Sequence, residues 1–181
     1  MGSPSTWSHR ALVAALALAG CGLSLYLTLY QWHVTGAVWD PIFGSMSSES
    51  VLHSAVSRAL PIPDATLGAM AYVVEASLAL AGGPDRWWRR AWLVLLFGLV
   101  AAVLALIGLA LVLTQIFVVR ALCTLCLCSA GISFINAWLA RREAFATLSY
   151  LQRGRRDGAP IWQLLRGGAQ SGADSPSGRA A

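Results

Sequence analysis

The chain has 181 residues, of which 57% are hydrophobic and 12% charged, and its mean hydropathy is +0.63. Soluble domains usually carry about 25% charged residues, and a domain of this length cannot hide so much apolar surface from water. The composition therefore excludes an ordinary soluble globule, a disordered chain and a disulfide-dense mini-protein. It predicts a multi-span membrane protein.

The positive charge is carried by arginine alone, since all 13 basic residues are Arg. A nucleic-acid-binding protein would gather such residues into a patch on a folded surface. Here they lie in the gaps between apolar runs. We therefore expect a lipid bilayer, and no nucleic acid, as the partner of this surface.

A helix needs about 20 apolar residues to cross a bilayer. The apolar run from Ala91 to Ala140 is far too long for one crossing, and Arg120 interrupts it, so the chain should turn there. The pattern predicts an all-α membrane protein, a bundle of four transmembrane helices. The expected spans are residues 11–32, 65–82, 90–118 and 122–140.

The distribution of arginine predicts the orientation. With four spans, both termini and the loop after residue 82 share one side, which holds every Arg except Arg58 and Arg120. Such an excess marks the cytoplasmic side. We expect residues 1–9 and the tail 143–181 to be cytoplasmic, with the tail disordered from about residue 167. The loop 34–63 should then face outward.

The outward loop contains a short apolar pattern. Apolar residues at positions 51, 52, 55, 56, 59 and 60 have helical spacing. Ser50 could cap the N-terminus of this helix, and Pro61 and Pro63 would end it. The pattern predicts a short amphipathic helix, which would either anchor the loop at the membrane surface or cover the outer end of the bundle.

The motif Cys123-Thr-Leu-Cys126 is the sharpest chemical feature. At the start of a helix, the two sulfurs share a face one turn apart, and the helix dipole favours a thiolate there. A reversible disulfide at the outward end of the last span suits this pattern. Packing of two small apolar residues and a zinc site, which would need further ligands, are the alternatives.

Four other residues carry weaker signals. Cys21 lies in the middle of a span and Cys128 points away from the Cys123–Cys126 face, so both are expected to pack against helices or lipid. Glu75 lies inside a span, either as a functional carboxylate or as an ion-pair partner of the cluster Arg86–Arg90. His53 could assist proton transfer or be an ordinary loop histidine.

Several segments together resemble the vitamin K epoxide reductase (VKOR) family. They are Leu23-Ser-Leu-Tyr-Leu-Thr28 in the first span, Val51-Leu52 with Ser54 in the loop, Pro61-Ile-Pro63 with Gly68, and Cys123-Thr-Leu-Cys126. The resemblance covers about residues 10–142. The order of these segments and the spacing between them make it more specific than the cysteine motif alone.

The resemblance implies a four-helix bundle around a quinone, either menaquinone or ubiquinone, with the outward loop helix as its lid. Cys123 would exchange disulfides, while Cys126, Leu52 and Ser54 would line the quinone site, and no metal would take part. A thioredoxin-like protein outside the cytoplasm would supply the electrons. The implied function is disulfide formation in exported proteins, from the cytoplasmic membrane of a bacterium.

The chain departs from the family pattern at two places. The family carries a second cysteine pair in the outer loop, but the matching positions are near Asp40 and Ser48. The family tyrosine after the cysteine motif is replaced by Ala130. Two hypotheses follow: an oxidoreductase whose Cys123–Cys126 pair is opened directly by a partner thiol, or a membrane interaction or assembly protein that has lost redox turnover.

Overall fold

A computed structural model describes residues 6–54 and 63–167, and every regular element within them is helical. The long helices follow the apolar runs of the sequence, and the short ones lie in the connections. In chain order the elements are α1 (Trp7–Gln31), α2 (Ser45–Leu52), α3 (Asp64–Leu80), α4 (Arg86–Arg89), α5 (Ala91–Thr114), the π-helix η1 (Gln115–Val119), α6 (Thr124–Arg156) and α7 (Ile161–Leu165).

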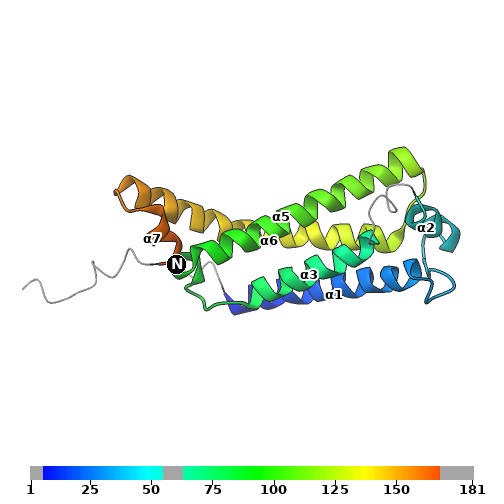
Figure 1. Cartoon of the computed structure of the whole chain (residues 1–181), viewed down its shortest axis with the longest axis horizontal. Helices are drawn as coiled ribbons and strands as arrows, with labels where there is room; N and C mark the ends of the chain where they lie inside the picture. Colours follow the sequence, from blue (N-terminus) through cyan, green and yellow to red (C-terminus); the bar gives the residue numbers. More distant parts are fainter. Residues whose placement is uncertain (1–5, 55–62, 168–181) are drawn as a thin grey trace, which may run out of the picture.

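The four long helices lie side by side along the length of the molecule (Figure 1). α1 packs mainly against α3, and α5 packs against α6, while further contacts join α1 to α6 and α3 to α5. The helix α2 and its loop lie at one end, and α4 and α7 lie at the other (Figure 1). We call these the α2 end and the α4–α7 end.

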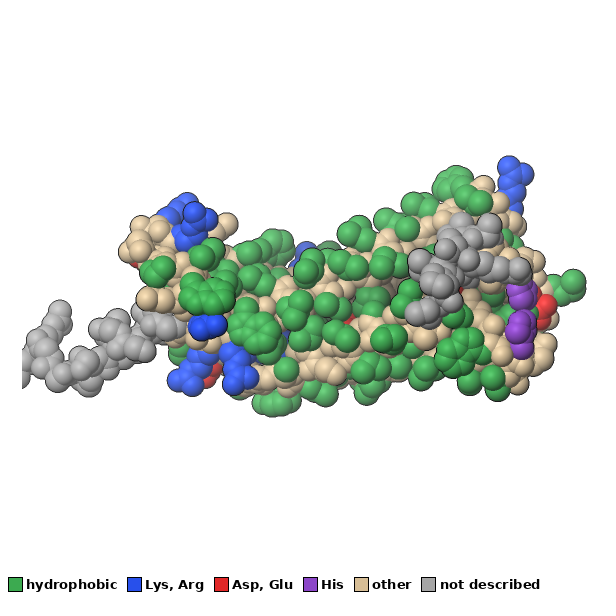
Figure 2. All heavy atoms as spheres, viewed as in Figure 1, with side chains coloured by type: hydrophobic (Ala, Val, Ile, Leu, Met, Phe, Trp, Pro, Cys, Tyr) green, Lys and Arg blue, Asp and Glu red, His purple; other side chains and the backbone are tan. Residues whose placement is uncertain are grey.

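The surface between the two ends suits a bilayer. Within the described residues, three helices are long and apolar enough to cross a membrane: α1, α5 continued by η1, and α6. The other predicted span forms α3, whose 17 residues give a length of about 25 Å, at the short limit for a crossing. Figure 2 shows hydrophobic side chains spread along the helices and arginines gathered mostly at the α4–α7 end.

The predicted turn at Arg120 is confirmed. The helix that starts at Ala91 ends in the wide turn η1, and Arg120 follows with φ 56°, in the left-handed region. The next helix does not stop near residue 140 as predicted, because α6 continues to Arg156. The predicted end of the helix is where the bilayer would end. The chain has no proline there, and the helix continues beyond that point. The expected tail is therefore helical over residues 143–156.

The end of α6 is covered by the short helix α7, at the apolar patch Ile161–Leu165. Leu164 is buried against Gly154, where an added Cβ would clash with a Leu164 methyl. The predicted disorder from about residue 167 concerns residues that lie almost entirely outside the described part of the chain.

The loop helix forms earlier than predicted. α2 begins at Ser45, after Gly44 with φ 82°, and ends at Leu52. Ser50 is therefore not its cap: it lies inside the helix and its hydroxyl donates to the Met46 carbonyl. The polar run before Val51 has no apolar periodicity, which is why the pattern missed it. The rest of the predicted helix, residues 55–60, lies outside the described residues.

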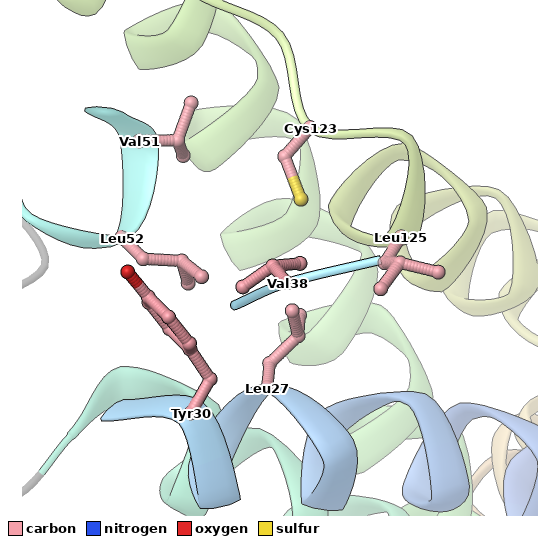
Figure 3. Close-up of a cluster of buried hydrophobic side chains, with 7 residues drawn as sticks. All are labelled: Leu27, Tyr30, Val38, Val51, Leu52, Cys123 and Leu125. Carbon is pink, nitrogen blue, oxygen red and sulfur yellow. The ribbon is translucent and has the colours of Figure 1, made fainter. Parts of the chain in front are cut away.

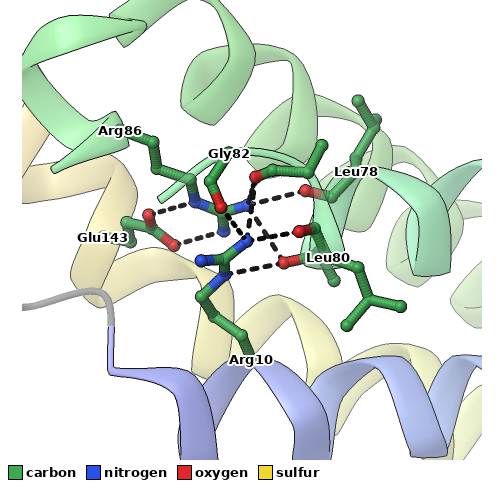
Figure 4. A network of polar contacts seen from close by, with 8 residues as sticks. Arg10, Leu78, Leu80, Gly82, Arg86 and Glu143 are labelled. Atoms are coloured by element: carbon green, nitrogen blue, oxygen red, sulfur yellow. Dashed lines mark hydrogen bonds and ion pairs between the residues drawn. The ribbon is translucent and has the colours of Figure 1, made fainter. Parts of the chain in front are cut away.

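A buried polar network fixes the α4–α7 end (Figure 4). Arg86 forms a two-pronged ion pair with Glu143, at 2.6 Å from Nε and 2.7 Å from Nη2. Arg86 and Arg10 also donate to the last carbonyls of α3 and the turn after it, those of residues 78–82. These carbonyls have no hydrogen-bond partner within the helix. Positive charges are also favourable there, because the C-terminal end of a helix carries a partial negative charge. The network thus joins α1, α3, α4 and α6.

Candidate functional site: a cysteine pair beneath a loop helix

The two cysteines of the motif lie where the last long helix begins. Cys123 is the N-cap residue of α6, and its sulfur accepts a hydrogen bond from the backbone N–H of Cys126 at 3.3 Å. A side-chain acceptor at this position satisfies one of the free N–H groups of the first turn. The cap therefore holds the two residues one turn apart on the same side of the helix, as the sequence spacing predicted.

The two thiols differ in exposure. Cys123 is 0% exposed and belongs to a cluster of side chains from α1, α2, the loop and α6. Figure 3 shows its sulfur pointing into this cluster, toward Val38 and Leu27. Cys126 is partly exposed. The structure thus covers the cysteine that the resemblance assigned to exchange with a partner.

The carboxylate of Asp40 ties the outer loop to the start of α6. It accepts hydrogen bonds from the Thr124 backbone N–H at 2.8 Å, from the Thr124 hydroxyl at 2.6 Å and from the Ser48 hydroxyl. Burial raises the pKa of Asp40, but the hydrogen bonds from Ser48, Thr124 and Phe43 outweigh it and hold that pKa well below its usual range. Asp40 and Ser48 are the residues near which the resemblance implies cysteines.

Ser48 lies between this carboxylate and the buried thiol. Its hydroxyl is in hydrogen-bond contact with both Asp40 and Cys123. A hydroxyl has one proton to donate, so Ser48 cannot donate to Asp40 and to a Cys123 thiolate at the same time. Cys123 precedes the helix Thr124–Arg156, which is long and apolar enough to cross a membrane. The hydrogen bond from the Cys126 thiol has the largest influence on the pKa of the Cys123 thiol and lowers it despite burial.

The π-helix supplies a further contact to the cysteine pair. Gln115 is the first residue of η1 and is 2% exposed, and its side-chain carbonyl accepts from the backbone N–H of Cys123 at 3.0 Å. Wide turns of this kind occur often at functional sites. Here the turn directs a polar side chain at the end of a long, mostly apolar helix toward the cysteine segment.

A pocket opens beside Cys126. It brings together Leu52, Ser54 and Cys126, the three residues expected to line a cofactor site. Its walls are largely apolar, and its polar groups come from the segment after α2 and from the ends of α3, α5 and η1. The other lining residues are Val51, Asp64, Leu111, Thr114, Gln115 and Val119.

The remaining predicted residues lie elsewhere. His53 is hydrogen-bonded to the hydroxyl of Tyr30 at 3.2 Å, and it does not line the pocket. Cys21 is buried and Cys128 is exposed, as expected for packing and lipid-facing residues. Glu75 accepts from Asn136, while Arg86, one member of the cluster Arg86–Arg90 considered as its ion-pair partner, binds Glu143. The described residues hold no cluster of three or more His, Cys, Asp or Glu suited to a metal.

Sequence reasoning missed the residues that hold the site together. Asp40 and Thr124 are 84 positions apart, and no periodicity links a loop carboxylate to a distant helix start. One signal was available: Gln115 lies at the end of a long apolar run. An amide buried there needs a hydrogen-bond partner, which would have indicated a polar contact near the turn.

Comparison with protein-family models gives a match to the vitamin K epoxide reductase family over residues 11–141, most of the chain. A search of curated proteins gives no match. The matched region runs from the second turn of α1 to the middle of α6, and it includes α3, α5, the outer loop and both cysteines of the motif. The chain therefore belongs to the vitamin K epoxide reductase family, and this membership indicates a membrane thiol–disulfide oxidoreductase.

Proposed function

We propose that the protein is a quinone-linked thiol–disulfide oxidoreductase that supports disulfide formation in exported proteins. The observation that carries this proposal is the position of the cysteine pair. Cys126 lies in the wall of a largely apolar pocket, and Cys123 caps the same helix one turn earlier. A disulfide between them would therefore form and open directly beside a site for an apolar electron acceptor.

The residues around the pocket suit a quinone. The aliphatic side chains of Leu52, Val51 and Leu111 offer contacts to a ring, and the polar side chains of Ser54 and Thr114 lie in the same walls. The Thr114 hydroxyl donates to the Ala110 carbonyl, so it would have to turn away from that carbonyl to donate to a quinone oxygen. When bound, a quinone would supply an acceptor for two electrons and two protons. Cys126 would face it, while Gln115 and Asp40 would keep Cys123 and the start of α6 in place.

Exchange with a protein partner requires access to Cys123. We propose a reduced thioredoxin-like protein outside the cytoplasm as the electron donor. One of its thiolates attacks Cys123 of the disulfide, Cys126 leaves as a thiolate, and the partner's second thiolate then releases Cys123. The partner becomes oxidised and the pair becomes a dithiol. Because Cys123 is covered by α2 and the loop, this exchange needs the loop to move away.

The proposed setting is the cytoplasmic membrane of a bacterium. Residues 10–142 would form the VKOR-like domain, in which α3 crosses the membrane together with α1, α5 and α6. The α2 end would face outward and both termini would be cytoplasmic. The gathering of arginine at the α4–α7 end (Figure 2) supports this orientation. It places the cysteine pair next to an oxidising compartment.

The test is rescue of disulfide formation in a bacterial strain that lacks its own quinone-linked thiol oxidase, with a matched donor protein expressed beside it. We expect the wild type to rescue, and Cys123→Ala and Cys126→Ala each to abolish rescue. Cys21→Ala and Cys128→Ala are the matched controls and should rescue like the wild type. A wild-type protein that reaches the membrane but fails to rescue with any donor would support loss of redox turnover instead.

A further inference from the structure

A buried carboxyl group lies away from the cysteine pair, at the seam between α3 and α6. Glu75 on α3 and Asn136 on α6 are both 0% exposed. The Asn136 amide donates to Glu75 Oε2 at 3.2 Å and to the Val13 carbonyl of α1 at 3.5 Å. The pair thus joins α3 to α6 through polar atoms, and Asn136 also reaches α1.

Two oxygen atoms of this pair lack a donor. Glu75 Oε1 and Asn136 Oδ1 are fully buried, and neither has a hydrogen-bond partner within the described part of the chain. Two acceptors without a donor are costly in an apolar setting. A proton on the carboxyl group would lower the cost, because it converts one of the two acceptors into an O–H donor.

No described cation neutralises Glu75. Arg86 forms its ion pair with Glu143, and Arg10 donates to carbonyls at the end of α3. From α6, the Asn136 amide donates to Glu75, and the same amide also donates to the Val13 carbonyl of α1. An unpaired carboxylate inside a membrane protein is expensive, so this environment favours the neutral acid.

Polar side chains extend from this pair toward the cysteine end. Tyr72, one turn before Glu75 on α3, has its hydroxyl 2.9 Å from the Ser129 hydroxyl and 2.7 Å from the Ser133 hydroxyl. Ser133 lies one turn from Asn136, and Ser129 lies one turn from Cys126 on α6. Hydroxyl groups both donate and accept, so they can pass a proton.

We propose that Glu75 and Asn136 form a proton-binding site, in which Glu75 is a neutral acid that exchanges its proton with the cysteine end through Tyr72, Ser133 and Ser129. The use of this proton rests on the proposed function. Oxidation of the dithiol releases two protons and two electrons, and reduction of a quinone takes up the same number. Glu75 would lend a proton and recover it, so the site leaves the overall balance unchanged.

The first test is infrared spectroscopy of the purified full-length protein in lipid nanodiscs at pH 7. We expect a carbonyl band of a protonated carboxylic acid in the wild type. Glu75→Gln should lose this band, because it keeps the shape of the Glu75 side chain but replaces the acid by an amide, whose NH₂ group is also a donor. Asp157→Asn, at an exposed position after α6, should keep the band. If Glu75→Gln instead removes a carboxylate band, the site is ionised and the proposal is overturned. This readout does not depend on any redox activity.

The second test asks whether Glu75 exchanges its proton with the cysteine end or only holds it. Tyr72→Phe should keep the infrared band, yet both Tyr72→Phe and Glu75→Gln should slow reduction of a water-soluble quinone by the prereduced protein severalfold. Neither should slow reduction of the Cys123–Cys126 disulfide by a small dithiol. Unchanged quinone rates in both variants would overturn the exchange. A wild type that keeps the band but reduces no quinone would instead contradict the proposed function.

Discussion

The two ends of the molecule are both fixed by carboxylates, but in different ways. At the α4–α7 end, Glu143 binds the charged partner Arg86 with both oxygens, and both side chains are nearly inaccessible. At the α2 end, Asp40 binds hydroxyl and backbone N–H groups of a loop and a helix start. A buried ion pair cannot be broken cheaply, whereas a partly exposed hydrogen-bonded carboxylate can exchange its partners for water.

The difference matches what each end has to do. The Arg86 network joins the helices and satisfies the carbonyls at the end of α3, so it gains from rigidity. The Asp40 network covers Cys123, so in a working oxidoreductase it has to open. The four predictions below test this contrast between a permanent joint and a releasable cover.

The largest expected effect is at the rigid end. Arg86→Met leaves Glu143 buried without its counter-ion, which should cost about 3–5 kcal/mol of unfolding free energy. Denaturant unfolding of the protein in detergent micelles measures it. The double variant Arg86→Met, Glu143→Leu should recover part of the loss. A cost below about 1 kcal/mol would mean that solvent screens the pair and would remove the contrast between the ends.

The next effect concerns the helix seam that connects the ends. A Cβ at Gly20 would lie 2.6 Å from the ring of Tyr72, so Gly20→Ala should cost about 1–3 kcal/mol by overpacking. The control is Gly22→Ala on the same helix, because nothing lies within 4 Å of that position. Thermal unfolding compares the two variants. Equal stability would show that α1 and α3 shift freely and that the seam is not rigid.

At the releasable end, Asp40→Asn should loosen the cover over Cys123. An asparagine offers one acceptor oxygen where the carboxylate receives donors on both of its oxygens, and its NH₂ group would face donors. We expect severalfold faster labelling of Cys123 by a membrane-impermeant maleimide, in a background with the other three cysteines replaced by alanine. Asp157→Asn, at the opposite end, is the matched control. Unchanged labelling would mean that Asp40 does not hold the loop.

The smallest effect is a pH dependence. The folded-state pKa of Asp40 lies below its usual range, so its contribution to stability is present above the unfolded pKa of about 4 and is lost as the pH falls through the folded value. Acid should therefore lower the melting temperature of the wild type more steeply than that of Asp40→Asn. Parallel acid profiles would show that the carboxylate contributes nothing to folding.

The sequence predicted those features that depend on local pattern. Long apolar runs became long helices, the turn fell at Arg120, and the motif Cys123–Cys126 opened the last long helix. Leu52 and Ser54 also came to the same pocket as Cys126. The helices, the turn and the position of the motif follow from apolar periodicity and from one interrupting charge, both of which a single chain displays. The expectation for Leu52 and Ser54 came from the family resemblance.

Features that depend on distant partners were not predictable. Glu75 could have paired with an arginine of the cluster Arg86–Arg90. In the structure Arg86 pairs with Glu143 of α6, and Asn136 is the hydrogen-bond partner of Glu75. Likewise, nothing local says that Asp40 reaches Thr124. The bilayer length gave a wrong end for α6, because a helix stops where its hydrogen bonds or packing stop and not where lipid does.

The central claim is that Cys123 and Cys126 form a redox pair served by an apolar electron acceptor. The most direct measurement counts alkylatable thiols by mass spectrometry, in a Cys21→Ala, Cys128→Ala variant, before and after the reduced protein meets a water-soluble quinone without oxygen. The account predicts that both remaining thiols lose reactivity together and regain it when a dithiol is added. Thiols that stay alkylatable in the presence of the quinone would contradict it.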